Sequence, residues 1–133
     1  MRSWARRLLV LAVLAVLALT LRPGHLSPPE NLNLVPLAGI VDEAVNVNGP
    51  IGMLNNVGNI ALFVPLGFLA HVVTRSKAAV VATSAGLSLA IETVQYFIGR
   101  SAEVDDVLLN TLGAALGLVL ATRVAAKARV PSA

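Results

Sequence analysis

The sequence predicts an all-α fold, a polytopic membrane protein that forms a bundle of four transmembrane helices. The first observation is composition: 56% of the 133 residues are hydrophobic and 13% are charged, whereas about 25% of the residues in soluble domains are charged. The second is that the charges cluster between long apolar stretches. Lipid requires each crossing segment to close its own backbone hydrogen bonds, and a helix does so.

Composition also excludes several classes of protein. The mean hydropathy of +0.80 excludes a disordered chain, a basic nucleic-acid-binding surface and nearly every ordinary cytosolic enzyme. The absence of cysteine excludes a thiolate metal site and a cysteine nucleophile. We therefore expect membrane lipids as partners, and no nucleic acid, cofactor or metal; protein partners stay open.

Four apolar stretches define the expected helices of a single domain, residues 1–133. Glu92 is the one charged residue inside these stretches, which run over Leu8–Leu21, Val57–Thr74, Ala78–Ile98 and Val107–Thr122. With their flanks they predict helices at about 5–21, 55–74, 78–98 and 105–123. Each is close to the roughly 20 residues that cross about 30 Å of hydrocarbon.

The first stretch is short and follows three arginines, so it also fits a secretory signal. Trp4 and Ala5 lengthen it if Arg6 and Arg7 extend to the lipid headgroups. The nearest small-residue cleavage pattern, 16–18, lies inside the apolar run. An uncleaved signal anchor is therefore favoured, and cleavage stays an alternative.

The distribution of Lys and Arg predicts the orientation. Most of the basic residues fall on one face of the membrane: Arg2, Arg6, Arg7, Arg75, Lys77, Arg123, Lys127 and Arg129. The other face receives Arg22 and Arg100, together with the acidic residues. The positive-inside rule therefore places both termini in the cytoplasm.

Two segments lie outside the expected helices. The loop 22–53 is rich in Pro, Asn and Gly, and a connection this long is usually functional or disordered. Its apolar segment 32–37 fits either a re-entrant or interfacial piece or a flexible hairpin. Residues 124–133 form a basic tail that anionic lipid would attract.

The second helix places asparagines at its extracytoplasmic end. Asn55 and Asn59 are four residues apart and share a face, with Asn56 beside them. Pro65 removes a backbone donor, which predicts a kink between Phe63 and Gly67 that opens a cavity. The alternative is that the asparagines cap the helix and the proline is tolerated.

The third helix carries a polar stripe of Ser88, Glu92 and Gln95 that leads to Arg100. Glu92 lies six residues before Ile98, about 9 Å below the outer end of the helix at 1.5 Å per residue. A carboxylate at that depth is a functional-site candidate by default. The alternative is a neutral Glu92 that joins two helices through a hydrogen bond.

The fourth helix opens with Asp105 and Asp106. Asn110, Gly113 and Gly117 follow on the stripe of Asp106, and glycines four apart let another helix approach closely. Capping of the helix start would explain one aspartate. It does not readily explain two aspartates and the asparagine below them.

Together these residues predict one polar layer at the outer leaflet, contributed by three helices. The candidate ligand-binding residues are Asn59, Glu92, Gln95, Arg100, Asp105, Asp106 and Asn110, with Glu92 as the candidate catalytic residue. The candidate helix-packing residues are Pro65, Gly67, Gly113 and Gly117.

The order of the motifs NIALFVPLGF, ETVQYFIGR and EVDDVLLNTLGAALG resembles the VanZ-like family of bacterial membrane proteins. The upstream segment NLNLVPL is similar to the Asn-Leu-x-Pro segment of that family. The resemblance implies an integral membrane protein, and the family's namesake is an accessory determinant of resistance to the glycopeptide teicoplanin. The family pattern falls on Asn59, Phe63, Pro65, Gly67, Glu92, Gln95, Arg100, Asp106, Asn110 and Gly113.

Three functions remain in competition. The leading hypothesis is a cell-envelope accessory protein that binds a lipid headgroup or a lipid-linked envelope precursor, with Arg100 contacting an anionic group. The second is a membrane-embedded enzyme with Glu92 as general base, although the sequence offers no reliable nucleophile. The third is a structural protein whose polar stripe fastens the helices and whose loop or tail contacts a partner.

Overall fold

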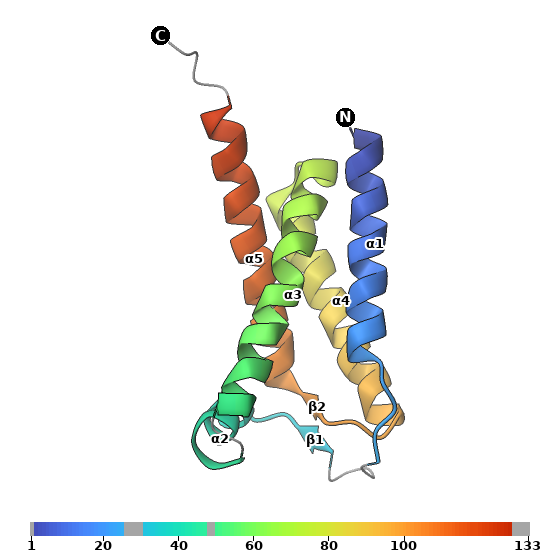
Figure 1. Cartoon of the computed structure of the whole chain (residues 1–133), viewed down its shortest axis with the longest axis vertical. Helices are drawn as coiled ribbons and strands as arrows, with labels where there is room; N and C mark the ends of the chain where they lie inside the picture. The colour runs from blue at the N-terminus through green and yellow to red at the C-terminus, as the bar shows by residue number, and fades with distance from the viewer. Residues whose placement is uncertain (1, 26–30, 48–49, 129–133) are drawn as a thin grey trace.

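Four long helices run side by side in the computed structural model, which describes residues 2–25, 31–47 and 50–128 (Figure 1). They are α1 (Arg2–Thr20), α3 (Pro50–Thr74), α4 (Lys77–Phe97) and α5 (Val104–Lys127). The start of α1 and the end of α5 lie at the same end of the bundle. The loops that join α1 to α3 and α4 to α5 lie at the opposite end, called the loop end below.

The prediction of an all-α transmembrane bundle is confirmed. All four helices are long and apolar enough to span a bilayer. Large apolar side chains remain exposed on their outer faces, for example Leu11 on α1, Leu89 on α4 and Leu112 on α5. In a soluble protein such a surface would be unstable in water, whereas lipid solvates it. The chain is a multi-pass membrane protein.

The helices begin and end within a few residues of the predicted limits. The largest difference is at α3, which starts at Pro50, where proline is well tolerated because the first turn needs no backbone donor. The helix continues without interruption through Pro65. At the other end of the chain α5 extends to Lys127, so the first part of the predicted tail is helical. Residues 129–133 lie outside the described residues.

Helices α3 and α5 form the tightest contact in the bundle, and glycine makes it possible. A Cβ atom at Gly113 would overlap the Ile60 carbonyl, and one at Gly117 would overlap the Val64 carbonyl. From the other side, Gly67 lies directly against the backbone of Ala114. The three glycines lie in the α3–α5 contact, where the sequence predicts that they pack. Pro65 differs, because its side chain is exposed and lies outside this seam.

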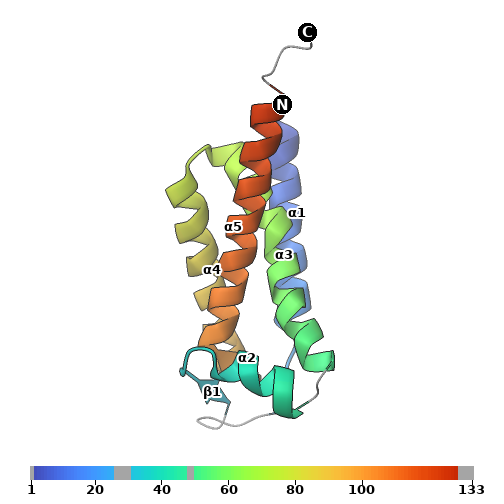
Figure 2. The ribbon, with the colours of Figure 1, turned by 90° about the vertical axis from the view of Figure 1, so that its left-hand side faces the viewer.

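Helices α1 and α4 close the core around this pair. Phe63 and Ile91 are almost fully buried, with Val16 of α1 and Ala114 of α5 packed against them. Figure 2 shows α5 in front, between α4 and α3, with α2 crossing below the bundle. The core therefore runs along the middle of all four helices and leaves the loop end to polar residues.

The long loop is folded in its described part. Leu32–Asn33 (β1) pairs in parallel with Ala102–Glu103 (β2), with Leu32 opposite Ala102. A short helix, α2 (Ala38–Asp42), and one turn of π-helix, η1 (Glu43–Val47), then lead toward α3. Residues 32–37 contact the connection after α4 and the start of α5, through the β1–β2 pairing and a hydrogen bond from Leu37 to Asp105. These contacts favour the interfacial alternative over a flexible hairpin. Glu30 and residues 48–49 lie outside the described residues.

The α3–α5 seam yields a first prediction. Replacing Gly113 by valine places a side chain where the Ile60 carbonyl lies, and overpacking of this kind costs about 1–3 kcal/mol of unfolding free energy. Thermal unfolding of the purified protein in detergent should show a lower Tm. Gly86→Val is the matched control, because a Cβ at Gly86 meets nothing within 4 Å. Equal Tm values for the two variants would contradict the close contact of α3 and α5 at Gly113.

Candidate functional site

The polar residues predicted to form one layer do gather at the loop end, but they divide into two groups. One group holds the loop and the helix ends in place. The other lines a cavity between α1, α3 and the α4–α5 connection. The group that holds the loop and the helix ends also positions the residues that line the cavity.

Asp105 anchors the long loop to the bundle. Its side chain is 2% exposed, and its two carboxylate oxygens accept hydrogen bonds from the backbone N–H groups of Leu37 (2.6 Å) and Ile40 (3.1 Å). Leu37 has a φ of 67°, a left-handed conformation that costs a non-glycine residue free energy. The carboxylate offsets this cost by satisfying donors at the start of α2.

Asn31 and Glu92 hold the connection between α4 and α5. The Asn31 amide nitrogen donates to the carbonyl oxygen of Tyr96 (3.0 Å), at the end of α4, and to that of Arg100 (2.7 Å), in the connection that follows. The Glu92 Oε2 atom accepts from the backbone N–H of Glu103 at 2.9 Å. Glu92 therefore ties α4 to β2 and to the start of α5.

Asn110 lies deeper in the bundle and joins two helices. Its amide nitrogen donates to the hydroxyl oxygen of Ser88 at 2.8 Å, and both side chains are buried. A hydrogen bond between helices is the simplest role of a polar residue at this depth. Ser88, Glu92 and Asn110 thus contribute to helix packing.

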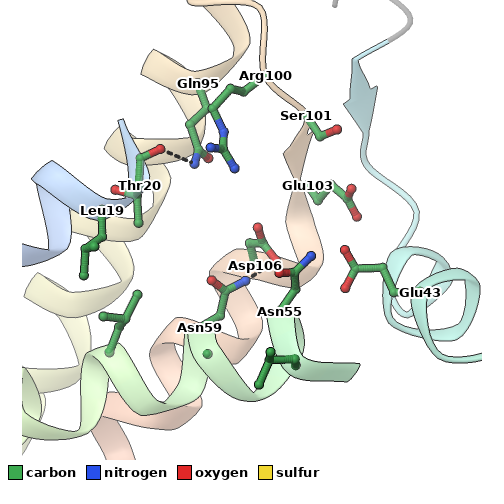
Figure 3. Close-up of a pocket in the computed structure, with 13 residues that line it drawn as sticks. Leu19, Thr20, Glu43, Asn55, Asn59, Gln95, Arg100, Ser101, Glu103 and Asp106 are labelled. Atoms are coloured by element: carbon green, nitrogen blue, oxygen red, sulfur yellow. Dashed lines mark hydrogen bonds between the residues drawn. The ribbon is translucent and has the colours of Figure 1, made fainter. Parts of the chain in front are cut away.

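The second group lines a cavity of about 350 Å³ at the loop end, shown in Figure 3. Helix α3, the end of α1, the connection 98–103, the start of α5 and η1 all contribute to its wall. The lining residues are Leu19, Thr20, Glu43, Leu54, Asn55, Gly58, Asn59, Leu62, Gln95, Arg100, Ser101, Glu103 and Asp106.

Hydrogen bonds within the wall fix two of these side chains. The Asn59 amide donates to Asp106 Oδ1 at 2.6 Å, which joins α3 to α5 at the base of the cavity. The Gln95 amide donates to the Thr20 carbonyl at 3.1 Å and so caps the end of α1. Arg100 follows Gly99, whose φ of 75° reverses the chain, and its guanidinium points into the cavity (Figure 3).

Two polar atoms around the cavity are left unsatisfied. The Gln95 side chain is 4% exposed, and its Oε1 atom has no hydrogen-bond partner among the described residues. The Nε atom of Arg100 is also buried and unpartnered within the described part of the chain. Buried polar groups in proteins are nearly always hydrogen-bonded. Gln95 Oε1 and Arg100 Nε are thus two buried polar atoms beside the cavity that the described part of the protein leaves unsatisfied.

The charges in the cavity are divided between its two sides. Arg100 lies beside Gln95 on the α4 side, whereas Glu43, Glu103 and Asp106 lie on the opposite side (Figure 3). Burial raises the pKa of Glu103, and the negative charges of Glu43 and Asp105 raise it further. Burial likewise raises the pKa of Glu43, partly offset by a hydrogen bond from Asn55. Burial and the neighbouring carboxylates thus both disfavour the charged forms of Glu43 and Glu103.

The structure brings together four of the seven predicted ligand-binding residues: Asn59, Gln95, Arg100 and Asp106 line the cavity. Asp105, Glu92 and Asn110 do not line it. Glu92 lines a separate, mostly apolar cavity with Leu32, Tyr96 and Phe97.

The sequence prediction missed Glu43, Ser101 and Glu103 as cavity residues, and it treated Asn55 only as a neighbour of Asn59 on the helix face. The position of Glu43 depends on how the long loop folds, which no periodicity in the loop indicates. Within the described ranges, no group of three His, Cys, Asp or Glu side chains is arranged to hold a metal ion.

The family pattern of VanZ/LLP1 matches residues 8–125, which covers all four long helices and the cavity. The chain belongs to the VanZ/LLP1 family. This confirms the resemblance drawn from the three sequence motifs. No curated protein and no solved structure matches the chain, so the family is the one likeness on which a functional argument for this VanZ/LLP1 protein can rest.

The anchoring role of Asp105 can be tested by proteolysis. Asp105→Ala removes both acceptors of the loop N–H groups, and a hydrogen bond to a charged group contributes about 1.5–3 kcal/mol. We expect cleavage within residues 31–47 to become faster, with Asp105→Asn intermediate because one acceptor oxygen remains. Asp106→Asn is the control, since Asp106 bonds Asn59 instead of the loop backbone. Unchanged cleavage in Asp105→Ala would contradict the role.

The pKa of Glu103, raised first by burial and then by the charges of Glu43 and Asp105, predicts how stability depends on pH. Because the folded protein raises the pKa of Glu103 above its ordinary value of 4.5, folding favours the protonated form, and stability is lost as pH rises above that value. Glu103→Gln should therefore raise the Tm near neutral pH and leave it unchanged at acidic pH.

The matched double variant tests the source of this effect. If the two carboxylates repel each other, the gains from Glu43→Gln and Glu103→Gln should be less than additive in the double variant. Additive gains would show that each carboxylate responds to burial alone.

Proposed function

We propose that this protein is an accessory cell-envelope protein that binds the phosphate-bearing headgroup of a membrane lipid or lipid-linked envelope precursor. The observation that carries the proposal is the Arg100 guanidinium, which points into a polar cavity at the end of a transmembrane bundle. A cation in such a place favours an anionic partner, and the Nε atom of Arg100 has no hydrogen-bond partner among the described residues.

The two-sided charge of the cavity supports a headgroup that combines a phosphate with hydrogen-bond donors. A guanidinium binds a phosphate through two parallel hydrogen bonds. Across the cavity, the carboxylates of Glu43, Glu103 and Asp106 accept hydrogen bonds from hydroxyl or ammonium groups. The unpartnered Gln95 oxygen is one more acceptor close to Arg100.

The proposed site lies at the outer leaflet. The basic residues outside the loop end, such as Arg6, Arg7 and Lys77, support cytoplasmic termini by the positive-inside rule. The start of α1 and the end of α5 lie opposite the cavity, so the cavity then faces outward. Lipid-linked precursors of the envelope would be accessible to the cavity at the outer surface of the membrane. The proposal includes a link between binding at this site and resistance to teicoplanin.

An enzyme with Glu92 as general base has less support than binding. The Glu92 carboxylate already accepts a hydrogen bond from the Glu103 backbone, and its neighbours in the second cavity are mostly apolar. A general base must reach the proton that it abstracts, and the polar cavity offers carboxylates that are closer to a bound headgroup.

Loss of the arginine tests the proposal directly. Arg100→Gln removes the charge and one of the two parallel donors, which corresponds to about 1.5–3 kcal/mol, or roughly a 10- to 100-fold weaker Kd. Binding of phosphatidylglycerol and of a polyprenyl phosphate to the detergent-purified protein can be measured by native mass spectrometry. The two lipids distinguish a membrane phospholipid from a precursor-type lipid.

Arg22→Gln is the matched control, because Arg22 is an exposed arginine at the same end of the bundle that does not line the cavity. We expect it to bind either lipid as the wild type does. Equal affinities of Arg100→Gln and the wild type for both lipids would refute the proposed function.

A further inference from the structure

An apolar groove runs along the outside of the bundle between α1 and α3. Its volume is about 340 Å³, close to that of the polar cavity. Its lining includes Ala12 and Ala15 of α1, and Ala61 and Pro65 of α3. The side chains of Ala15, Ala61 and Pro65 are exposed, so the groove is open to the surrounding lipid along its length.

The groove adjoins the polar cavity. Gly58 and Leu62 of α3 line both of them. A polar, charged space at the loop end therefore lies next to an apolar space that extends toward the middle of the bundle. A lipid is divided in the same way, into a polar headgroup and an apolar hydrocarbon chain.

The groove exists because α1 and α3 do not pack closely at the small residues that line it. On α5, Gly113 and Gly117 contact the α3 backbone directly, as small residues in membrane helices usually do. At Gly58, in contrast, an added Cβ would meet nothing within 4 Å. Helix α1 is also peripheral, since 11% of its span is buried against 39% for α5.

We propose that this groove binds one acyl chain of a glycerophospholipid whose headgroup occupies the polar cavity. The inference rests on the proposed function and adds the path of the lipid tail. From Gly58 to Pro65 the groove follows seven residues of α3, about 10 Å at 1.5 Å per residue. That length lies within one leaflet, about 15 Å of hydrocarbon, and suits an acyl chain better than a long polyprenyl chain.

The polar cavity beside the groove contains an unsatisfied acceptor. Gln95 is buried and lines the cavity, and its Oε1 atom has no hydrogen-bond partner among the described residues, which favours a bound group with a donor. A lipid would enter sideways from the bilayer with its tail in hydrocarbon throughout. The groove would then hold the chain by close packing, because moving a chain from lipid into the groove brings no hydrophobic gain.

The experiment labels the groove from the lipid side. The full-length protein, in nanodiscs, is mixed with phosphatidylglycerol that carries a diazirine in one acyl chain, and the cross-linked residues are mapped by mass spectrometry after illumination. We expect labels on residues 12–16 and 58–65. Gly58→Leu, which fills the groove, should reduce this labelling roughly tenfold, which corresponds to about 1.4 kcal/mol of binding.

Gly86→Leu is the matched control, because Gly86 of α4 is equally open and lines none of the cavities described above; labelling should match the wild type. Ala61→Leu is a second groove-filling variant at an exposed position, so the test does not depend on the folding of one variant. Wild-type labelling in both groove variants would overturn the inference.

The outcomes separate this inference from the proposed function. If Arg100→Gln loses phosphatidylglycerol binding while Gly58→Leu is labelled like the wild type, the headgroup site stands and the acyl path is wrong. If a polyprenyl phosphate displaces the label and unlabelled phosphatidylglycerol does not, the acyl-chain assignment is overturned. If Arg100→Gln binds both lipids as the wild type does, the proposed function itself fails.

Discussion

The buried carboxylate of Asp105 is the interaction on which the loop end depends. A buried carboxylate is tolerated only where donors surround it, and Asp105 obtains two from the backbone of the long loop at Leu37 and Ile40. The same contact fixes the start of α2 and therefore the position of η1, which brings Glu43 to the cavity. Without it, the acidic side of the cavity would lose one of its walls, and the loop would lose its attachment to α5.

Neighbouring polar residues at the loop end have different roles because a helix turns about 100° per residue. Asp105 faces the loop, whereas Asp106 faces α3 and accepts from Asn59. On α4, Glu92 faces the start of α5 and Gln95 faces the end of α1. The structure thus combines two of the sequence hypotheses: part of the polar layer fastens helices, and part lines the space proposed to bind a ligand.

The close α3–α5 seam and the open α1–α3 groove are two uses of the same residue type. Gly113 and Gly117 meet a backbone across the seam, whereas Gly58 meets nothing within 4 Å. In lipid there is no hydrophobic force to close a gap between helices. A groove at the edge of a membrane bundle can therefore remain open to acyl chains, and α1 lies peripheral to the close α3–α5 pair.

The sequence by itself determined the family, the number of spans and which glycines pack, because lipid imposes length and hydrophobicity on every crossing segment and helical periodicity places Gly113 and Gly117 on one face. It also indicated Asn59, Gln95, Arg100 and Asp106 as polar residues that lie together near one end of the bundle, and these four line the cavity. Only the tertiary structure decided that Asp105, Glu92 and Asn110 hold the protein together, and that Glu43 and Glu103 lie on the same side of the cavity, opposite Arg100. Those roles depend on which backbone groups a non-helical loop brings near each carboxylate, and the fold of such a loop follows from long-range contacts that no local pattern encodes.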